Sequence, residues 1–238
     1  MRRENAANTG AKLSAETTRS KLAIGVLASG NGTNLQAIID AIEANKLNAV
    51  IKIVISDKPG VYALKRAASH NIPVETVDKK LFASREVFDA EIVRLLQKHD
   101  VHLVVLAGFM RLLTPCFIAS FRERIINIHP SLLPSFPGLD AQKRAIEHGA
   151  KFAGCTVHFV DEGLDSGPII IQAVVPVLQD DTVETLSKRI LAQEHRIYPE
   201  AIRLFAENRI SVNGRRVLIR NARESVDAMT NPLVAVSD

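Results

Sequence analysis

Three polar residues in the second half of the chain have the types and spacing of an acid-base site. Asn127 and His129 stand two residues apart at the end of an apolar run, and in an extended strand this spacing points both side chains to one face. Asp165 follows on a loop between Gly163 and Gly167, where a carboxylate can reach the imidazole and hold it charged and oriented. An amide donor, an imidazole and a carboxylate together can move protons and stabilise charge.

The alternative interpretation is a pair of ordinary polar groups at a strand end. A single Asn or His in that place is usually a side chain with satisfied hydrogen bonds. An amide in a buried strand costs on the order of 1 to 3 kcal/mol of desolvation unless partners are supplied. Because Asn127 and His129 would bring two such costs to one face, a chemical role is favoured.

A glycine-rich segment, Ser29 to Leu35, follows the first predicted strand and runs into a helix. Glycine lets the backbone approach a ligand closely, and a helix start offers unpaired N–H groups and positive partial charge to an anion. The segment matches neither the dinucleotide fingerprint, which needs a third glycine, nor the Walker loop with its Gly-Lys-Ser/Thr ending. It predicts a phosphate site, with a plain turn capped by Asn34 as the alternative.

The elements that must position these residues are predicted by the hydrophobic pattern, which alternates between strands and helices from Leu22 onwards. Strands that are apolar on both faces predict an α/β, Rossmann-like fold, with a mostly parallel central sheet and helices on both faces. Pro199 should kink or break the longest helix, and Asn213-Gly214 predicts a terminal hairpin. The predicted strands are 22–28, 50–55, 73–77, 101–106, 125–129, 156–160 and 169–177, and the predicted helices are 35–42, 61–70, 88–96, 115–122, 142–148 and 183–208.

The basic charge is concentrated at the start of the chain. Of the net charge of +4, residues 1–21 carry +3. The remainder is nearly neutral and poor in aromatic residues, so no nucleic acid partner is expected. Residues 1–21 have almost no large apolar side chain and predict a disordered tail before a single domain at 22–238. A mitochondrial targeting peptide is the less favoured alternative, because Glu4 and Glu16 are unusual in such peptides.

Other classes of protein are disfavoured by what the sequence lacks. No apolar stretch reaches the roughly 20 residues that a membrane helix needs, and no secretory signal follows Met1, so we expect a cytoplasmic protein away from membranes. Cys116 and Cys155 have no CxxC spacing and are expected to be reduced, buried thiols. The seven histidines show no ligand spacing, and no metal is predicted. A monomer and a homodimer both remain open.

Five segments in order resemble the phosphoribosylglycinamide formyltransferases, a family of folate-dependent enzymes of de novo purine biosynthesis. The likeness extends from Leu22 to about Asn208. It implies the formyltransferase fold, with 22–121 as the ribonucleotide-binding half and 122–238 as the catalytic and folate-binding half. The five segments are Ser29 to Ile38, Leu106 to Arg111, Asn127 to Pro134, Leu164 to Pro168 and Gln193 to Pro199.

The resemblance implies transfer of the formyl group of the co-substrate 10-formyltetrahydrofolate to the amine of glycinamide ribonucleotide. The implied catalytic residues are Asn127, His129 and Asp165. The ribonucleotide would be held by Gly32, Thr33, Asn34 and, near the glycinamide end, Glu194. The folate would contact Arg85, Met110, Arg111, Leu112, Leu113 and Asn127, with the loop 161–165 closing on the pterin.

This assignment agrees with the chemistry of the side chains. Attack of the amine on the formyl carbon places negative charge on an oxygen, and Asn127 can donate a hydrogen bond to it, a contact worth roughly 2.7 to 4 kcal/mol in acyl transfer. His129, charged beside Asp165, can stabilise the same charge and supply a proton to the departing N10, directly or through water. No Ser or Cys is needed, because the substrate brings the nucleophile.

Two positions depart from the family pattern, and three relatives are alternatives. Asp140 replaces a histidine and Leu191 a glutamine that other members carry, so the local substrate contacts there are not implied. Methionyl-tRNA and sugar-nucleotide formyltransferases, formyltetrahydrofolate deformylase and a catalytically silent nucleotide-binding module are the alternatives. The roughly 30 residues after Asn208 are too few for the additional C-terminal domain of the tRNA enzyme. The 21-residue tail is too short for the N-terminal regulatory domain of the deformylase. A silent module would lack the three catalytic groups.

Overall fold

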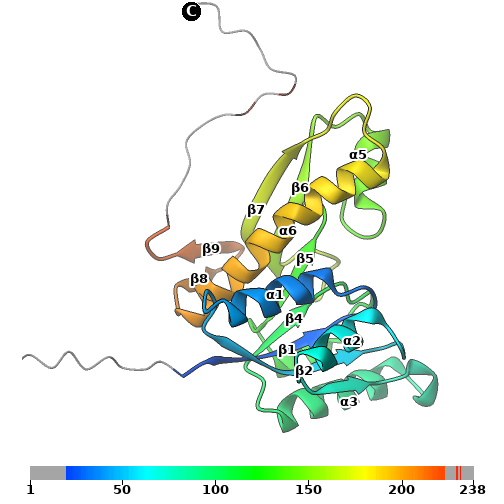
Figure 1. Ribbon diagram of the computed structural model, residues 1–238, viewed down its shortest axis with the longest axis vertical. Coiled ribbons are helices and arrows are strands. Elements are labelled where there is room, and N and C mark those ends of the chain that lie inside the picture. The colour runs from blue at the N-terminus through cyan, green and yellow to red at the C-terminus, as the bar shows by residue number, and fades with distance from the viewer. Residues whose placement is uncertain (1–19, 223–228, 230, 232–238) are drawn as a thin grey trace, which may run out of the picture.

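The protein folds around one mixed sheet with helices on both of its faces (Figure 1). The computed structural model describes residues 20–222, 229 and 231. The predicted disordered tail at 1–21 lies outside the described residues, apart from its last two positions. In the described part, the strands follow the order β3-β2-β1-β4-β5-β6-β7-β9-β8.

Each predicted element appears, with its ends displaced by a few residues at most. The largest difference is at β6, which begins four residues before the predicted start because apolar and small residues extend it. The strands are β1 (Leu22–Leu27), β2 (Ala49–Ser56), β3 (Val74–Thr76), β4 (Leu103–Leu106), β5 (Ile125–His129), β6 (Phe152–Phe159), β7 (Ile169–Pro176), β8 (Ile210–Asn213) and β9 (Arg216–Ile219). The helices are α1 (Thr33–Glu43), α2 (Tyr62–Ser69), η1 (Lys79–Leu81, a 3₁₀ turn), α3 (Arg85–Lys98), α4 (Pro115–Ser120), α5 (Ala141–Glu147) and α6 (Val183–Ala206).

The pairing confirms the mostly parallel α/β sheet and shows where the direction reverses. Strands β3, β2, β1, β4 and β5 are parallel, whereas β6 is antiparallel to both β5 and β7. Leu27 pairs with both Ile55 and Leu106, and Leu106 pairs in turn with Asn127. Since parallel strands end at the same edge, the segments that follow β1, β2, β4 and β5 meet there.

Successive side chains of β1 point to opposite faces of the sheet and pack into two separate cores. Ile24 and Val26 belong to the cluster under α1, α2 and α6, whereas Leu27 belongs to the cluster under α3 and α4. The second cluster packs closely on the backbone at Gly25, where a Cβ would lie 2.5 Å from Leu96 Cδ2. Both faces of the sheet are therefore covered, which fixes the positions of the strand ends.

The structure corrects two expectations about single residues. Helix α6 runs through Pro199 without a break, because the nearby Tyr198 and Ala201 are fully buried and hold the helix on the sheet despite the missing backbone N–H of the proline. Cys116 is exposed rather than buried, since Phe117 takes the inward position of α4. Cys155 is buried as expected.

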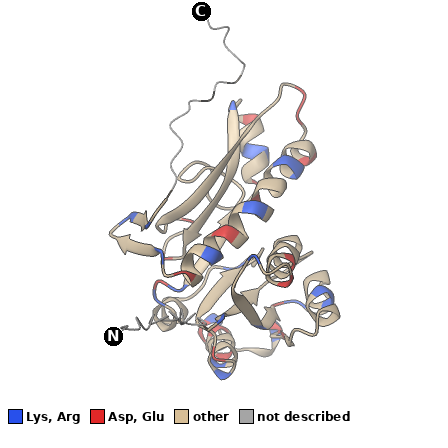
Figure 2. Ribbon diagram, turned by 60° about the vertical axis from the view of Figure 1, so that its left-hand side comes forward, with Lys and Arg blue, Asp and Glu red and all other residues tan. Residues whose placement is uncertain are grey.

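Within the described residues, no helix has the length and apolar character to cross a membrane. The longest helix, α6, carries Lys and Arg as well as Glu along its length (Figure 2). Its apolar residues form one stripe that packs on the sheet, including Ile190 and Ile202.

Candidate functional site

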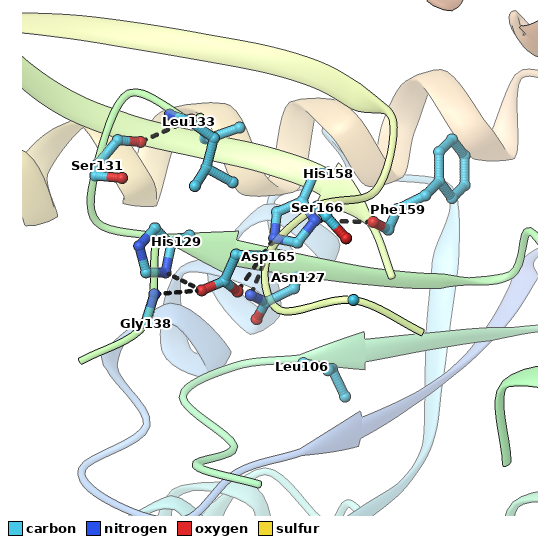
Figure 3. A network of polar contacts seen from close by, with 12 residues as sticks. Leu106, Asn127, His129, Ser131, Leu133, Gly138, His158, Phe159, Asp165 and Ser166 are labelled. Carbon is cyan, nitrogen blue, oxygen red and sulfur yellow. Dashed lines mark hydrogen bonds and ion pairs between the residues drawn. The ribbon is translucent and has the colours of Figure 1, made fainter. Parts of the chain in front are cut away.

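The fold brings His129 and Asp165 together beside Asn127 (Figure 3). His129 closes β5 and is 5% exposed, and its Nδ1 lies 3.3 Å from Asp165 Oδ2. Asp165 adopts a left-handed backbone with φ 48°, in a loop where Ser166 Oγ donates to Asp161 Oδ1 at 2.6 Å. The predicted contact between imidazole and carboxylate is therefore present.

The second ring nitrogen of His129 also faces an acceptor. Its Nε2 lies 3.0 Å from the carbonyl oxygen of Phe136, which can only accept, so Nε2 carries a proton. Asp165 Oδ2, opposite Nδ1, additionally accepts from the backbone N–H of Gly138 at 2.8 Å. An imidazole with both N–H donors satisfies these two partners, and the segment from Phe136 to Gly138 holds the pair from one side.

Asn127 has a partner that the sequence did not predict. Its Nδ2 lies 3.2 Å from Nε2 of His158, which stands opposite it in the antiparallel register of β5 and β6. His158 is 2% exposed, and burial lowers its pKa below the ordinary histidine value. The available signal was a histidine inside a second apolar strand, but its position opposite Asn127 depends on the strand pairing.

The loop that carries Asp165 is braced by the hairpin of β8 and β9. Arg215, in the turn between β8 and β9, donates from its guanidinium to the carbonyl oxygen of Ser166 at 2.8 Å. Gly167 lets the loop turn back closely, since a Cβ there would lie 1.8 Å from Phe159 O. Ser166, the residue next to Asp165, is thus held by a residue 49 positions later in the chain.

The glycine-rich segment leads into α1 without a side-chain cap, which leaves the first backbone N–H groups of the helix available to an anion. Gly32 is the N-cap, with φ 71° and ψ 33°, and no side chain caps the helix there. A Cβ at Gly32 would lie 2.7 Å from Ala63 Cβ and 2.8 Å from Ala63 Cα, so this turn needs glycine. The alternative of a turn capped by Asn34 is wrong, because the Asn34 side chain bonds elsewhere.

Asn34 reaches across to α6 instead. Its Nδ2 donates to Oε2 of Glu194 at 2.7 Å, and its Oδ1 is buried without a hydrogen-bond partner. Glu194 is 7% exposed; burial raises the pKa of its carboxyl, and the hydrogen bond from Asn34 partly opposes this effect. The two predicted ribonucleotide-binding residues therefore touch, and each places a polar group beside the start of α1.

The residues predicted to bind the folate fall into two groups. Met110 and Leu112 are 68% and 56% exposed on the segment after β4, which is tied to the glycine-rich loop because the Met110 N–H donates to Ser29 Oγ at 3.2 Å. Leu113 is instead buried in the core, and its carbonyl oxygen accepts from Arg85 at 3.0 Å.

Arg111 completes this segment. Its guanidinium lies 4.5 Å from the centre of the Phe88 ring, and its Nε is buried without a hydrogen-bond partner. The exposed apolar side chains of Met110 and Leu112 thus adjoin a buried cationic donor. A ligand with a flat apolar body and an anionic group fits this combination.

A groove of about 810 Å³ lies between α1 and α6 and was not predicted. Thr33, Arg66 and His195 are among the residues that line it. Asn127, His129 and Asp165 do not line it, so the predicted acid-base chemistry lies elsewhere, at the carboxyl edge of the sheet.

The chain is similar to known proteins over most of its length. Residues 22–202 match the family model described as formyl transferase. The chain is 44% identical over 188 residues to phosphoribosylglycinamide formyltransferase of Escherichia coli (strain K12), covering 79% of this chain and 89% of that protein.

Two further relatives show how the length of the chain compares. The crystal structure of glycinamide ribonucleotide transformylase 1 from Symbiobacterium toebii is 54% identical with a TM-score of 0.84, covering 85% of this chain and 95% of that chain. The trifunctional purine biosynthetic protein adenosine-3 of Chironomus tentans is 48% identical over 195 residues, covering 81% of this chain and 14% of that protein. The chain thus spans a small part of the trifunctional relative and nearly all of the bacterial ones.

Proposed function

Because this chain belongs to the formyl transferase family, we propose that it transfers the formyl group of 10-formyltetrahydrofolate to the amine of glycinamide ribonucleotide in purine biosynthesis. The geometry of three side chains supports this reaction independently of the family match. His129 Nδ1 lies 3.3 Å from Asp165 Oδ2, beside Asn127, at the sheet edge where the glycine-rich segment follows β1. The acid-base groups and an anion site therefore share one edge.

The proposed roles follow from what each side chain can donate. 10-Formyltetrahydrofolate supplies the formyl group, and the ribonucleotide amine supplies the nucleophile. Asn127 donates an amide N–H to the formyl oxygen as negative charge develops on it, which lowers the barrier because the donor is already in place. His129 stabilises the same charge and gives a proton to N10 as the bond between the formyl carbon and N10 breaks, with Asp165 orienting the ring. The attacking amine loses one proton as it becomes an amide, so the transfer as a whole consumes no proton.

The contact between His129 and Phe136 constrains the proton transfer. The Nε2 proton points at the carbonyl oxygen of Phe136, 3.0 Å away. Direct donation from Nε2 therefore requires the segment around Phe136 to release the ring, whereas donation from Nδ1 would break the contact with Asp165. We propose the first route, because it keeps the contact between Nδ1 and Asp165 intact while the proton leaves from Nε2.

Binding of the ribonucleotide is assigned to Gly32, Thr33, Asn34 and Glu194. The uncapped start of α1 suits a phosphate, because the first N–H groups of a helix have no partner within the helix. The unpartnered Asn34 Oδ1 suits a donor on the same ligand, and Glu194 suits the amine.

The folate is assigned to the segment after β4, with Met110 and Leu112 against its apolar rings and Arg85 and Arg111 near its carboxylates. The unpartnered Nε of Arg111 supports this placement. In this proposal residues 22–238 are one domain, and the predicted division into a ribonucleotide-binding half at 22–121 and a catalytic and folate-binding half at 122–238 is not strict, because Arg85 and Arg111 lie in the first half and Glu194 in the second. Cytoplasmic location and a monomer or homodimer remain predictions.

A competition assay tests the proposal, in which the full chain is incubated with 10-formyltetrahydrofolate and three possible formyl acceptors. Glycinamide ribonucleotide, methionyl-tRNA and water are offered together, and the formylated products and free formate are measured. We expect formylation of glycinamide ribonucleotide. Formate as the main product would indicate a deformylase, formylated tRNA would indicate the tRNA enzyme, and binding of both substrates without turnover would indicate a silent module.

A further inference from the structure

His158 lies directly opposite Asn127 on the neighbouring strand, and the mechanism above makes no use of it. The antiparallel register pairs the two residues, and Asn127 Nδ2 lies 3.2 Å from His158 Nε2 (Figure 3). His158 is 2% exposed, whereas Asn127 is half-buried. The histidine therefore stands behind the amide, away from solvent.

The hydrogen bonds fix where the proton of His158 is. Its Nδ1 lies 2.8 Å from the carbonyl oxygen of Phe159, which can only accept, so Nδ1 carries the proton. Burial lowers the pKa of His158, and His129 adds to this effect, while the contact with Phe159 and the charges of Asp165 and Asp161 act against it. The neutral ring thus presents a lone pair at Nε2.

A lone pair at Nε2 determines the orientation of the Asn127 amide. The atom that faces it has to be the Nδ2 donor, since Oδ1 in that place would meet a second acceptor. Asp165 Oδ1, an acceptor, lies 3.8 Å from the same Nε2, beyond hydrogen-bonding distance, whereas the Asn127 Nδ2 donor lies within it at 3.2 Å.

We propose that His158 is a positioning residue, which fixes the Asn127 amide so that its second N–H, and not its oxygen, faces the reacting formyl group. This inference rests on the proposed formyl transfer. An amide free to rotate by 180° would present its oxygen in part of the molecules and repel the developing negative charge. With His158 as acceptor, the donor is oriented before the reaction, which is the arrangement that stabilises an oxyanion most.

Two substitutions separate this role from simple packing. His158→Gln places a carbonyl oxygen near the position of Nε2 and can accept from Asn127. His158→Asn is too short to reach Asn127, although it can still donate to the carbonyl of Phe159. His102→Asn is the matched control, because His102 is exposed and precedes β4, at the opposite edge of the sheet from Asn127.

We expect His158→Asn to lower kcat by about 10- to 100-fold, with KM for both substrates within about threefold of wild type, because a misplaced catalytic group affects the chemical step. His158→Gln should recover most of the lost kcat, and His102→Asn should change nothing. Equal kcat for the Asn and Gln variants, or a loss that appears mainly in KM, would overturn the proposal.

A double substitution tests the coupling to Asn127. In an Asn127→Ala background, His158→Asn should cause no further loss, because the residue through which it acts is gone. An undiminished further loss means that His158 acts by another route and overturns the proposal. Circular dichroism and thermal unfolding of each variant show whether it folds.

Nitrogen-15 NMR of the wild-type protein labelled at histidine gives a readout that does not depend on activity. At neutral pH we expect His158 to carry its proton on Nδ1 and none on Nε2. A proton on Nε2 overturns the positioning role even if formyl transfer is confirmed. A wild-type protein with this tautomer but without formyl transfer would instead refute the proposed function, and with it the role of His158.

Discussion

Asn34 and Glu194 are joined by a hydrogen bond of 2.7 Å across 160 positions of the chain. Asn34 lies in the first turn of α1, and Glu194 lies on the sheet-facing side of α6. The bond fixes a buried carboxylate beside the helix start to which we assign the phosphate. It therefore links the stability of the fold to the proposed substrate site.

Glu194→Gln should make stability less dependent on pH. Burial raises the pKa of Glu194 in the folded protein above its unfolded value, so the folded state holds this proton more tightly. The resulting stability is fully present below the unfolded pKa, near 4.5, and is lost as the pH rises through the folded pKa. In denaturant unfolding from pH 4.5 to 8.5, the free energy of unfolding of the variant should increase relative to that of wild type as the pH rises.

Glu184→Gln serves as the control for this series, because Glu184 is exposed on the same helix and pairs with Lys188. Its effect should stay within about 0.5 kcal/mol at every pH. A constant difference between wild type and Glu194→Gln across the range would contradict the assignment of a raised pKa.

Gly32→Ala should weaken the binding of glycinamide ribonucleotide. The new Cβ would lie 2.7 Å from Ala63 Cβ, so the turn has to shift away from the start of α1. We expect KM for the ribonucleotide to rise by about tenfold or more, with KM for the folate within about threefold, because the displaced N–H groups serve the phosphate. Steady-state kinetics with each substrate varied in turn provide the measurement.

Gly60→Ala controls for backbone strain. Gly60 has the same φ of 71°, but a Cβ there meets open space. Both alanine variants should lose about 1 to 2 kcal/mol of stability from the left-handed conformation, and the Gly60 variant should keep both KM values. Equal rises in the two KM values of Gly32→Ala would contradict the assignment of the phosphate to this loop.

Asp165→Asn should lower kcat by about 10- to 100-fold or more while leaving ribonucleotide affinity within a few-fold of wild type, since the carboxylate orients the His129 ring. Asn tolerates the left-handed backbone of this position, so the loop should keep its shape. Single-turnover rates and binding titrations separate the two quantities.

Asp100→Asn makes the same substitution at φ 51°, in an exposed turn away from the site, and should leave the rate unchanged. If affinity for the ribonucleotide collapsed together with the rate in Asp165→Asn, the carboxylate would have a binding role in place of an orienting one.

Tyr198→Phe should destabilise the protein by about 1 to 3 kcal/mol, because two buried carbonyl oxygens lose the hydroxyl proton that they share. The fully buried hydroxyl of Tyr198 lies 2.9 Å from Leu106 O and 3.1 Å from Ile126 O. Tyr62→Phe, at a side chain that is 53% exposed, should change stability by less than about 0.5 kcal/mol. Similar denaturation midpoints for the two variants would show that the buried contact contributes little.

Local patterns in the sequence determined the order of the elements and the shared face of Asn127 and His129. Residues of β1 form a short continuous apolar run, and apolar residues repeat every third or fourth position in α1, patterns that follow from the geometry of a buried strand and of a helix. The glycine-rich turn was also predictable, since Gly32 is needed at one backbone conformation. Such features are set by neighbours in the chain.

The tertiary structure alone decided which partners these side chains meet. His158 stands behind Asn127 because β6 runs antiparallel to β5, and a shift of the register by one residue would turn His158 to the other face. Phe136 reaches His129, and Asn34 reaches Glu194, through contacts between segments that no local period relates. A hydrogen bond depends on the position of both partners to within a fraction of an ångström, and only the packed sheet and helices fix that position.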